Sequence, residues 1–250
     1  MRKIVVANWK MNGSRSLIEA YKSTCATFEA AAVEVVVCPP FPLLADARQS
    51  LNQQLRVGAQ DCSAHTDGAR TGDVSAALLA EVGAQYCIIG HSERRAGHTE
   101  TSELISLKQR QLIAKDIRPI LCVGETDVER REDRWKKVLN AQLEAAFQSG
   151  TGPSLVAYEP VWAIGTGLIP TSEIIVETIS YIRKQLGAKT GAQSSLRVLY
   201  GGSADETSAA RLVSLDGVSG LLVGGASLDA RRFGAMISSV AETNWDVLRD

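Results

Sequence analysis

A carboxylate, Glu159, stands where a short apolar run ends and a loop begins. Pro160 follows it and cannot donate to a sheet ladder, so a strand over Leu155-Val156-Ala157 must stop there. The loop continues with apolar residues, 161–164, and then with Gly165-Thr166-Gly167. An apolar loop between proline and glycine is typical of a lid that folds over a bound molecule. A carboxylate beneath such a lid is a candidate general base.

Further polar or glycine residues follow other apolar runs in the same way. They are Asn8 and Lys10, then His91, Ser92 and Glu93, then Gly201-Gly202-Ser203, and finally Gly224-Gly225. Each has an alternative explanation, since Lys10 could lie on the surface, His91 could cap a helix and paired glycines could form a tight turn. Their common position after strands favours one shared site at one end of a sheet.

The elements that carry these residues alternate along the chain. Eight apolar runs of strand length are present: 4–7, 35–38, 55–59, 87–89, 120–123, 155–157, 198–199 and 221–223. Such continuous runs suit strands buried on both faces, as in a parallel sheet. Apolar residues between them recur at helical spacing, most clearly over 135–147, 175–186 and 233–240, while charged runs such as 130–133 are expected to face solvent. Eight strand–helix units of about thirty residues predict an α/β fold, a (β/α)8 barrel forming a single domain over 1–250.

The glycine-rich segments suit a phosphate group. Glycine allows a phosphate to approach backbone N–H groups, and the loops after the last two strands are the usual phosphate site of such barrels. The chain lacks a G-x-x-x-x-G-K-[ST] motif, and a G-x-G-x-x-G pattern from Gly165 fails at Pro170. His65, His91 and His98 have no paired ligand spacing. We therefore expect no cofactor and no metal.

Composition narrows the class of partner and compartment. The formal net charge of −1 gives no reason to expect nucleic acid or an anionic membrane as a partner. The five cysteines are scattered without a C-x-x-C pair, which is typical of a reducing compartment. The apolar run after Met1-Arg2-Lys3 is too short for a signal peptide, and no run approaches the ~18 residues of a membrane span. We expect a cytoplasmic protein.

With these motifs together, the chain resembles the triosephosphate isomerase family along its whole length. The resemblance is carried by Asn8-Trp9-Lys10-Met11-Asn12-Gly13, Gly90-His91-Ser92-Glu93-Arg94-Arg95, the segment from Ala157 to Gly167, Tyr200-Gly201-Gly202-Ser203, and Leu222-Val223-Gly224-Gly225-Ala226-Ser227. Together these motifs are highly specific.

The resemblance implies a TIM barrel that interconverts dihydroxyacetone phosphate and D-glyceraldehyde 3-phosphate through an enediolate. It implies Glu159 as the base, His91 as the neutral group that polarises the carbonyl, and Lys10 as the charge that stabilises the oxygens. Substrate contacts are expected from Asn8, Lys10, Gly165, Ser203, Gly224 and Gly225. The segment 160–167 is expected to close over the substrate.

The family is typically homodimeric, which implies that the loop from Asp61 to Asp73 enters a partner and brings Thr71 near its active site. Two departures from the family pattern stand out. Arg70 replaces an aromatic or apolar residue and Asp73 replaces glutamate, which bears on dimer strength. After the lid, Leu168-Ile169-Pro170 replaces a Lys-Thr-Ala hinge. We expect Pro170 to be a fixed post before a helix capped by Thr171 or Ser172.

Two other functions are compatible with a phosphate-binding barrel. One is another sugar-phosphate isomerase or epimerase, which would lack the lysine, histidine and glutamate at these three places. The other is a barrel that binds a phosphometabolite without catalysis, which loss of Glu159 or Lys10 would favour. Both residues are present.

Overall fold

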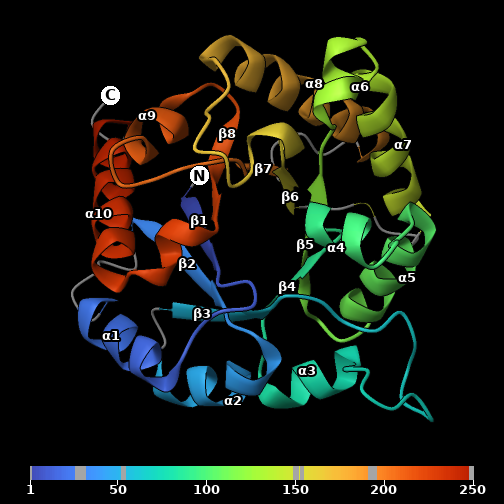
Figure 1. Cartoon of the computed structure of the whole chain (residues 1–250), viewed down its shortest axis with the longest axis vertical. Coiled ribbons are helices and arrows are strands. Elements are labelled where there is room, and N and C mark those ends of the chain that lie inside the picture. The colour runs from blue at the N-terminus through green and yellow to red at the C-terminus, as the bar shows by residue number, and fades with distance from the viewer. Residues whose placement is uncertain are drawn as a thin grey trace.

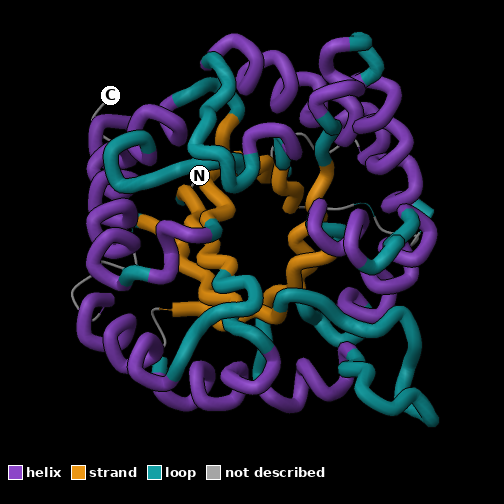
Figure 2. The backbone as a smooth tube through the Cα atoms, viewed as in Figure 1, coloured by secondary structure: helices purple, strands orange, loops and turns teal. Residues whose placement is uncertain are grey.

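Eight parallel strands form a closed barrel in the computed structural model of the chain, which describes residues 2–25, 32–51, 55–148, 152, 155–190 and 196–247. The strands are β1 (Lys3–Asn8), β2 (Val33–Cys38), β3 (Leu55–Ala59), β4 (Tyr86–Ile89), β5 (Arg118–Val123), β6 (Leu155–Tyr158), β7 (Arg197–Tyr200) and β8 (Val218–Val223). Each strand pairs in parallel with the next, and β8 pairs with β1 to close the ring (Figure 2). The predicted (β/α)8 barrel is confirmed. The domain span expected from sequence, 1–250, includes residues outside the described ranges.

Helices surround this ring of strands on all sides (Figure 1). Those of the described residues are α1 (Arg15–Cys25), α2 (Phe41–Ser50), α3 (Ala76–Val82), α4 (Ser92–Gly97), α5 (Ser102–Ile113), α6 (Asp127–Arg131), α7 (Trp135–Phe147), α8 (Ser172–Thr190), α9 (Ala209–Ser214) and α10 (Ala230–Val247), with the 3-10 helices η1 (Val161–Ala163) and η3 (Gly225–Leu228). The three helical stripes predicted from apolar spacing lie in α7, α8 and α10. Over the described part of the chain, the helices lack the length and apolar character needed to cross a bilayer.

Alternate residues of each strand face two separate apolar cores. In β1, Ile4 and Val6 belong to a cluster inside the barrel, whereas Val5 and Ala7 belong to the larger cluster between the sheet and the helices. All four side chains are fully buried. Burying an aliphatic side chain of this size contributes roughly 1.5–3 kcal/mol. Burial on both faces explains why the strands appear as continuous apolar runs in the sequence.

In the charged run 130–133, residues 131–133 are exposed as predicted, whereas Arg130 is only partly exposed. Arg130 turns inward, where its Nε lies 3.0 Å from Oε1 of Glu125 and its Nη2 donates to the Thr178 hydroxyl at 2.7 Å. Its guanidinium also stacks over the Trp135 ring, 4.5 Å from the centroid. Glu125 is fully buried, and a buried carboxylate requires a cation or hydrogen-bond donors to compensate for lost hydration. That requirement comes from the fold and explains why Arg130 is not solvated.

Candidate active site

One cavity of about 300 Å³ at the carboxyl ends of the strands collects the site residues expected from the sequence. It is lined by Asn8, Lys10, His91, Glu159, Gly165, Ser203, Gly224 and Gly225, among others. Asn8 is the last residue of β1, and Glu159 directly follows β6. The parallel barrel therefore brings together residues up to 217 positions apart (Asn8 to Gly225), because all its strands end at the same rim.

Glu159 is held in a fixed position on the cavity wall. Its side chain is 2% exposed, and Oε2 accepts a hydrogen bond of 2.9 Å from the Ser92 amide. Oε1 lies 3.0 Å from Nε2 of His91. The backbone N–H of Glu159 donates to the carbonyl of Val123 at 2.8 Å, which continues the β5–β6 pairing one residue beyond β6. One carboxylate oxygen is thus anchored and the other faces the imidazole.

His91 both caps a helix and faces the cavity, so the structural and functional interpretations of this residue are compatible. It is the N-cap of α4, and its Nδ1 accepts a hydrogen bond of 3.2 Å from the Glu93 amide. An accepting Nδ1 carries no proton, so the imidazole is the neutral tautomer with its proton on Nε2. The Nε2–H therefore faces Glu159 and the cavity.

Lys10 lies at the other side of the cavity in a strained backbone conformation. Its φ is +52°, in the left-handed region, which costs a non-glycine residue on the order of 1–3 kcal/mol. Two contacts hold it there: its amide donates to Oδ1 of Asn8 at 3.0 Å, and its carbonyl accepts from Nε2 of Gln60 at 2.9 Å. Its Nζ lies 2.5 Å from Oε1 of Glu93. The contact with Glu93 places the ammonium group at the rim.

The glycines at the far end of the cavity leave room for a ligand. A Cβ atom added at Gly225 would meet no atom within 4 Å, so packing within the protein does not require glycine there. A Cβ atom at Gly224 would lie 3.2 Å from Cε of Lys10. Gly225 also begins η3, and the N–H groups at the start of a helix can bind phosphate. Ser203 lies close by, and its hydroxyl donates to the Ala163 carbonyl at 2.7 Å.

The apolar loop after Glu159 is anchored at one end and exposed at the other. Trp162 donates from Nε1 to the buried Glu125 carboxylate at 3.2 Å, and the Val161 amide donates to the Glu125 carbonyl at 3.1 Å. By contrast, residues 165–168 are exposed, and Leu168 is 59% exposed. An exposed apolar side chain at the edge of a cavity is typical of a loop that buries this side chain when it closes over the cavity.

Several residues of the site were not assigned by the sequence. Glu93 was placed at the rim but not recognised as the partner of Lys10, and Ser92 was not recognised as the donor to Glu159. Arg232, in the first turn of α10, also lines the cavity and pairs with Glu206 at 2.9 Å. Its position shortly after Gly224-Gly225 is the one sequence signal that could have indicated it.

Asp205 lines the cavity beside Arg232 and organises the start of α9. Hydrogen bonds from the hydroxyl and amide groups of Ser208 and Thr207 lower the pKa of Asp205 to about 2. Those bonds form a turn at the start of α9. The backbone carbonyl of Asp205 also accepts a hydrogen bond of 3.0 Å from the Ala209 amide. The carboxylate thus supports a loop of the cavity wall.

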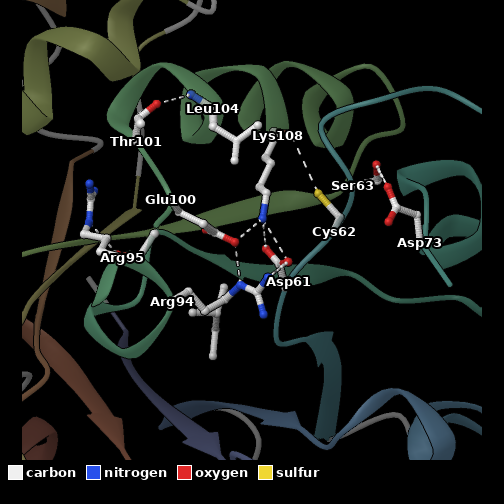
Figure 3. Close-up of polar contacts among 12 residues, drawn as sticks. Asp61, Cys62, Ser63, Asp73, Arg94, Arg95, Glu100, Thr101, Leu104 and Lys108 are labelled. Atoms are coloured by element: carbon white, nitrogen blue, oxygen red, sulfur yellow. Dashed lines mark hydrogen bonds and ion pairs between the residues drawn. The ribbon is translucent and has the colours of Figure 1, made fainter. Parts of the chain in front are cut away.

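A group of four charged side chains, three of them buried and Arg94 partly exposed, holds α4, and so His91, against its neighbours (Figure 3). Lys108 on α5 lies 2.6 Å from both Asp61 and Glu100. Arg94 on α4 contacts the same two carboxylates at 2.8 and 2.7 Å. Two cations and two carboxylates therefore balance, and Arg94 connects the helix behind His91 to the segments after β3 and before α5.

Fold and cavity together are those of a (β/α)8 barrel with a carboxylate and an imidazole 3.0 Å apart at its rim, which is where enzymes of this fold carry their active sites. Among the described residues, no group of three or more His, Cys, Asp or Glu side chains is arranged to hold a metal ion. Residues 3–240 match the family described as "Triosephosphate isomerase". The chain belongs to the triosephosphate isomerase family.

Relatives agree with this assignment over nearly their full length. A triosephosphate isomerase of Acidiphilium cryptum (strain JF-5) is 45% identical over 252 aligned residues, which cover 96% of this chain and 99% of the relative. Those of Ruegeria pomeroyi and Jannaschia sp. are 42% and 43% identical, each alignment covering 96% of this chain and 98% of the relative. The chain is an isomerase that interconverts dihydroxyacetone phosphate and D-glyceraldehyde 3-phosphate in glycolysis and gluconeogenesis.

Proposed function

We propose that Glu159, His91 and Lys10 are the catalytic residues of this interconversion. The observation that carries the proposal is the 3.0 Å approach of the Glu159 Oε1 to the His91 Nε2 within the rim cavity. A carboxylate and a neutral imidazole so placed can act on adjacent atoms of one substrate. Lys10 lines the same cavity.

These positions support the following sequence of steps. Glu159 takes the proton from C1 of dihydroxyacetone phosphate. The electron pair of the C1–H bond forms the C1–C2 double bond, and the π pair of the C2 carbonyl moves onto its oxygen to give an enediolate. The Nε2–H of His91 donates to the oxygens, and proton exchange between them prepares the aldehyde. Glu159 then returns its proton to C2, which gives D-glyceraldehyde 3-phosphate. The Lys10 ammonium offsets the negative charge of the intermediate.

Substrate is held at its phosphate end by backbone groups. We assign this binding to Gly165, Ser203, Gly224 and Gly225, with Asn8 and Lys10 at the reacting end. Open space beside Gly225 and the N-terminus of η3 support the assignment. Closure of 160–167 would exclude water from Glu159 and protect the enediolate from loss of phosphate.

The chain is also proposed to act as a homodimer in the cytoplasm. The segment between β3 and α3 extends away from the barrel (Figure 1), and it includes Thr71. A further groove, of about 350 Å³, lies next to Lys10 and His91 and is distinct from the rim cavity. Met11 is one of the residues that line this groove. The Met11 side chain is 96% exposed, and an apolar side chain beside such a groove suits burial by a second subunit.

The decisive experiment is a coupled assay with D-glyceraldehyde 3-phosphate on the parent enzyme and the Glu159→Gln variant. The amide keeps the shape of the side chain but cannot accept the substrate proton, so kcat should fall by ~10²–10⁴ with a small change in KM. Glu19→Gln, at an exposed position of α1, is the matched control and should retain full activity. Parental turnover in Glu159→Gln would remove Glu159 as the base.

A further inference from the structure

A second cavity, of about 690 Å³, lies at the opposite end of the barrel from Glu159. Its walls come from the start of β1, the middle of α8, the residue before β7 and the turn that leads into β8. These are the amino ends of strands, whereas the proposed active site is at their carboxyl ends. We refer to this hollow, lined by Arg2, Lys3, Arg183, Lys184 and Asp216 among others, as the basic cavity.

Charge in the basic cavity differs strongly from charge over the whole chain. Four of its lining residues are Lys or Arg and one is Asp, so their formal sum is 4 − 1 = +3. The complete chain has a formal net charge of −1. Positive charge is therefore concentrated here, and a hollow lined by one sign of charge attracts ions of the other sign.

Lys3 forms a fixed cationic part of the wall. Its Nζ donates to the carbonyl oxygens of Val213 and Val218, at 2.8 and 2.6 Å. Both acceptors are neutral, so these bonds orient the ammonium group without cancelling its charge. Burial lowers the pKa of Lys3 because the charged form has lost hydration. An anion in the cavity would compensate for that loss.

Arg183 is also placed by a neutral group. Arg183 donates from Nη1 to the carbonyl of Leu196 at 3.1 Å, which holds its guanidinium at the wall. The nearest buried carboxylate outside the cavity, Glu34, already accepts from Arg197 at 2.8 Å and from the Tyr86 hydroxyl. Arg2 also pairs with Glu34, at 3.7 Å. The hydrogen bonds of Lys3 and Arg183 are to neutral carbonyl groups, so these bonds do not cancel the two positive charges.

Size and hydroxyl content indicate the class of ligand. The basic cavity has more than twice the volume of the rim cavity, about 690 against 300 Å³, and the rim cavity is proposed to hold a triose carrying one phosphate. Its wall also includes Ser180, Ser214 and Ser219. Lysine, arginine and hydroxyl groups are the side chains that contact phosphate oxygens. We propose that the basic cavity binds a small anion that carries two or more phosphate groups.

Inorganic tripolyphosphate is a suitable probe because it has this charge and no other recognition element. The full-length ¹⁵N-labelled enzyme is titrated with it at low ionic strength, with saturating dihydroxyacetone phosphate to occupy the rim. The expected result is a saturable shift of the backbone amides of Gly217, Val218 and Ser219, which line the basic cavity. Shifts confined to Gly224 and Gly225, or no saturation up to ~10 mM, would overturn the proposal.

Two charge-reversal variants separate a defined site from general attraction. Lys184→Glu reverses an exposed charge at the cavity, and Lys137→Glu reverses an exposed charge on α7 that does not line it. We expect Lys184→Glu to weaken tripolyphosphate binding at least ~10-fold and Lys137→Glu less than ~2-fold, because Coulomb attraction falls with distance and salt screening. Both variants should keep the parental kcat/KM. Equal weakening by the two variants would show non-specific attraction and overturn the proposal.

Discussion

Gly124 and Glu159 are packed so closely that a Cβ atom on Gly124 would lie 1.7 Å from the Glu159 carbonyl oxygen. The contact is between backbones, which cannot move aside as a flexible side chain can. On another side of Glu159, a Cβ atom at Gly201 would lie 3.1 Å from the Glu159 Cγ. Gly124 and Gly201 directly follow β5 and β7, the strands on either side of β6, and together they fix the position of the proposed base.

Gly124→Ala should displace Glu159 and reduce catalysis. Because a misplacement of ~1 Å can cost ~10²-fold in rate, we expect kcat to fall by at least ~10-fold. The added methyl group should also lower the free energy of unfolding by roughly 1–3 kcal/mol. Gly97→Ala, where a Cβ atom would meet nothing within 4 Å, is the control and should change neither quantity appreciably. Steady-state kinetics and urea unfolding measure both effects, and parental kcat in Gly124→Ala would contradict the positioning role.

The charged group around Lys108 should be essential for stability. Lys108→Met leaves Asp61 and Glu100 as buried carboxylates with only Arg94 between them. Removing one member of a buried ion pair typically costs roughly 3–5 kcal/mol, so we expect a loss of that size at pH 7. Lys137→Met, on the exposed face of α7, should change the free energy of unfolding by less than ~0.5 kcal/mol.

The loss in Lys108→Met should depend on pH in a defined direction. Burial raises the pKa of Glu100, but hydrogen bonds and charges from Lys108 and Arg94 outweigh it and hold that pKa below its ordinary value of 4.5. The stabilisation contributed by Glu100 is therefore complete above pH 4.5 and is lost as the pH falls through its lower folded value, whereas burial outweighs the same two cations at Asp61 and raises the pKa of that carboxyl above 3.8. The difference between parent and variant in chemical unfolding should shrink as the pH falls below 4.5. A difference that grows there would exclude this account.

The sequence predicted the strands because each is buried on both faces and so forms an unbroken apolar run. It missed their polar first residues, such as Arg118 and Arg197, which lie outside the apolar core at the strand starts. It predicted the site because strand ends share one rim. It could not predict pairs such as Lys10 with Glu93, since a contact between residues 83 positions apart depends on the folded path.

A dimer is the expected form in solution. Sedimentation of the parent at micromolar concentration should give twice the mass of the 26.8 kDa chain. Replacing 68–72 by two glycines removes Thr71 and leaves the Asp67–Ser75 hydrogen bond of 2.6 Å in place. This variant should sediment as a monomer, and its kcat should fall by at least ~10-fold because the rim residues lose the neighbouring subunit. A fully active monomeric parent would refute both the dimer and the role of Thr71.

The lid is expected to bend at Gly167 and Leu168, not at Pro170. Gly167 has a φ of +76°, which proline cannot adopt, and Leu168 is 59% exposed. Pro170 is buried. Thr171 directly after it caps α8: its carbonyl accepts from the Ile175 amide at 3.1 Å. The helix cap, predicted at Thr171 or Ser172, is thus at Thr171, and Pro170 is fixed beside it.

Two substitutions, Pro170→Ala and Gly167→Pro, test which of the two positions is the hinge of the lid. Pro170→Ala should cost roughly 0.4–1 kcal/mol of stability, because the unfolded chain gains freedom. It should change kcat by less than about tenfold, or ~1.4 kcal/mol of barrier, since the bending residues are unchanged. Gly167→Pro forces a negative φ where +76° is needed and should impair closure far more. NMR relaxation dispersion of residues 160–168, measured with kcat in both variants, tests the order of the effects. If Pro170→Ala slows closure more than Gly167→Pro does, the hinge lies at Pro170.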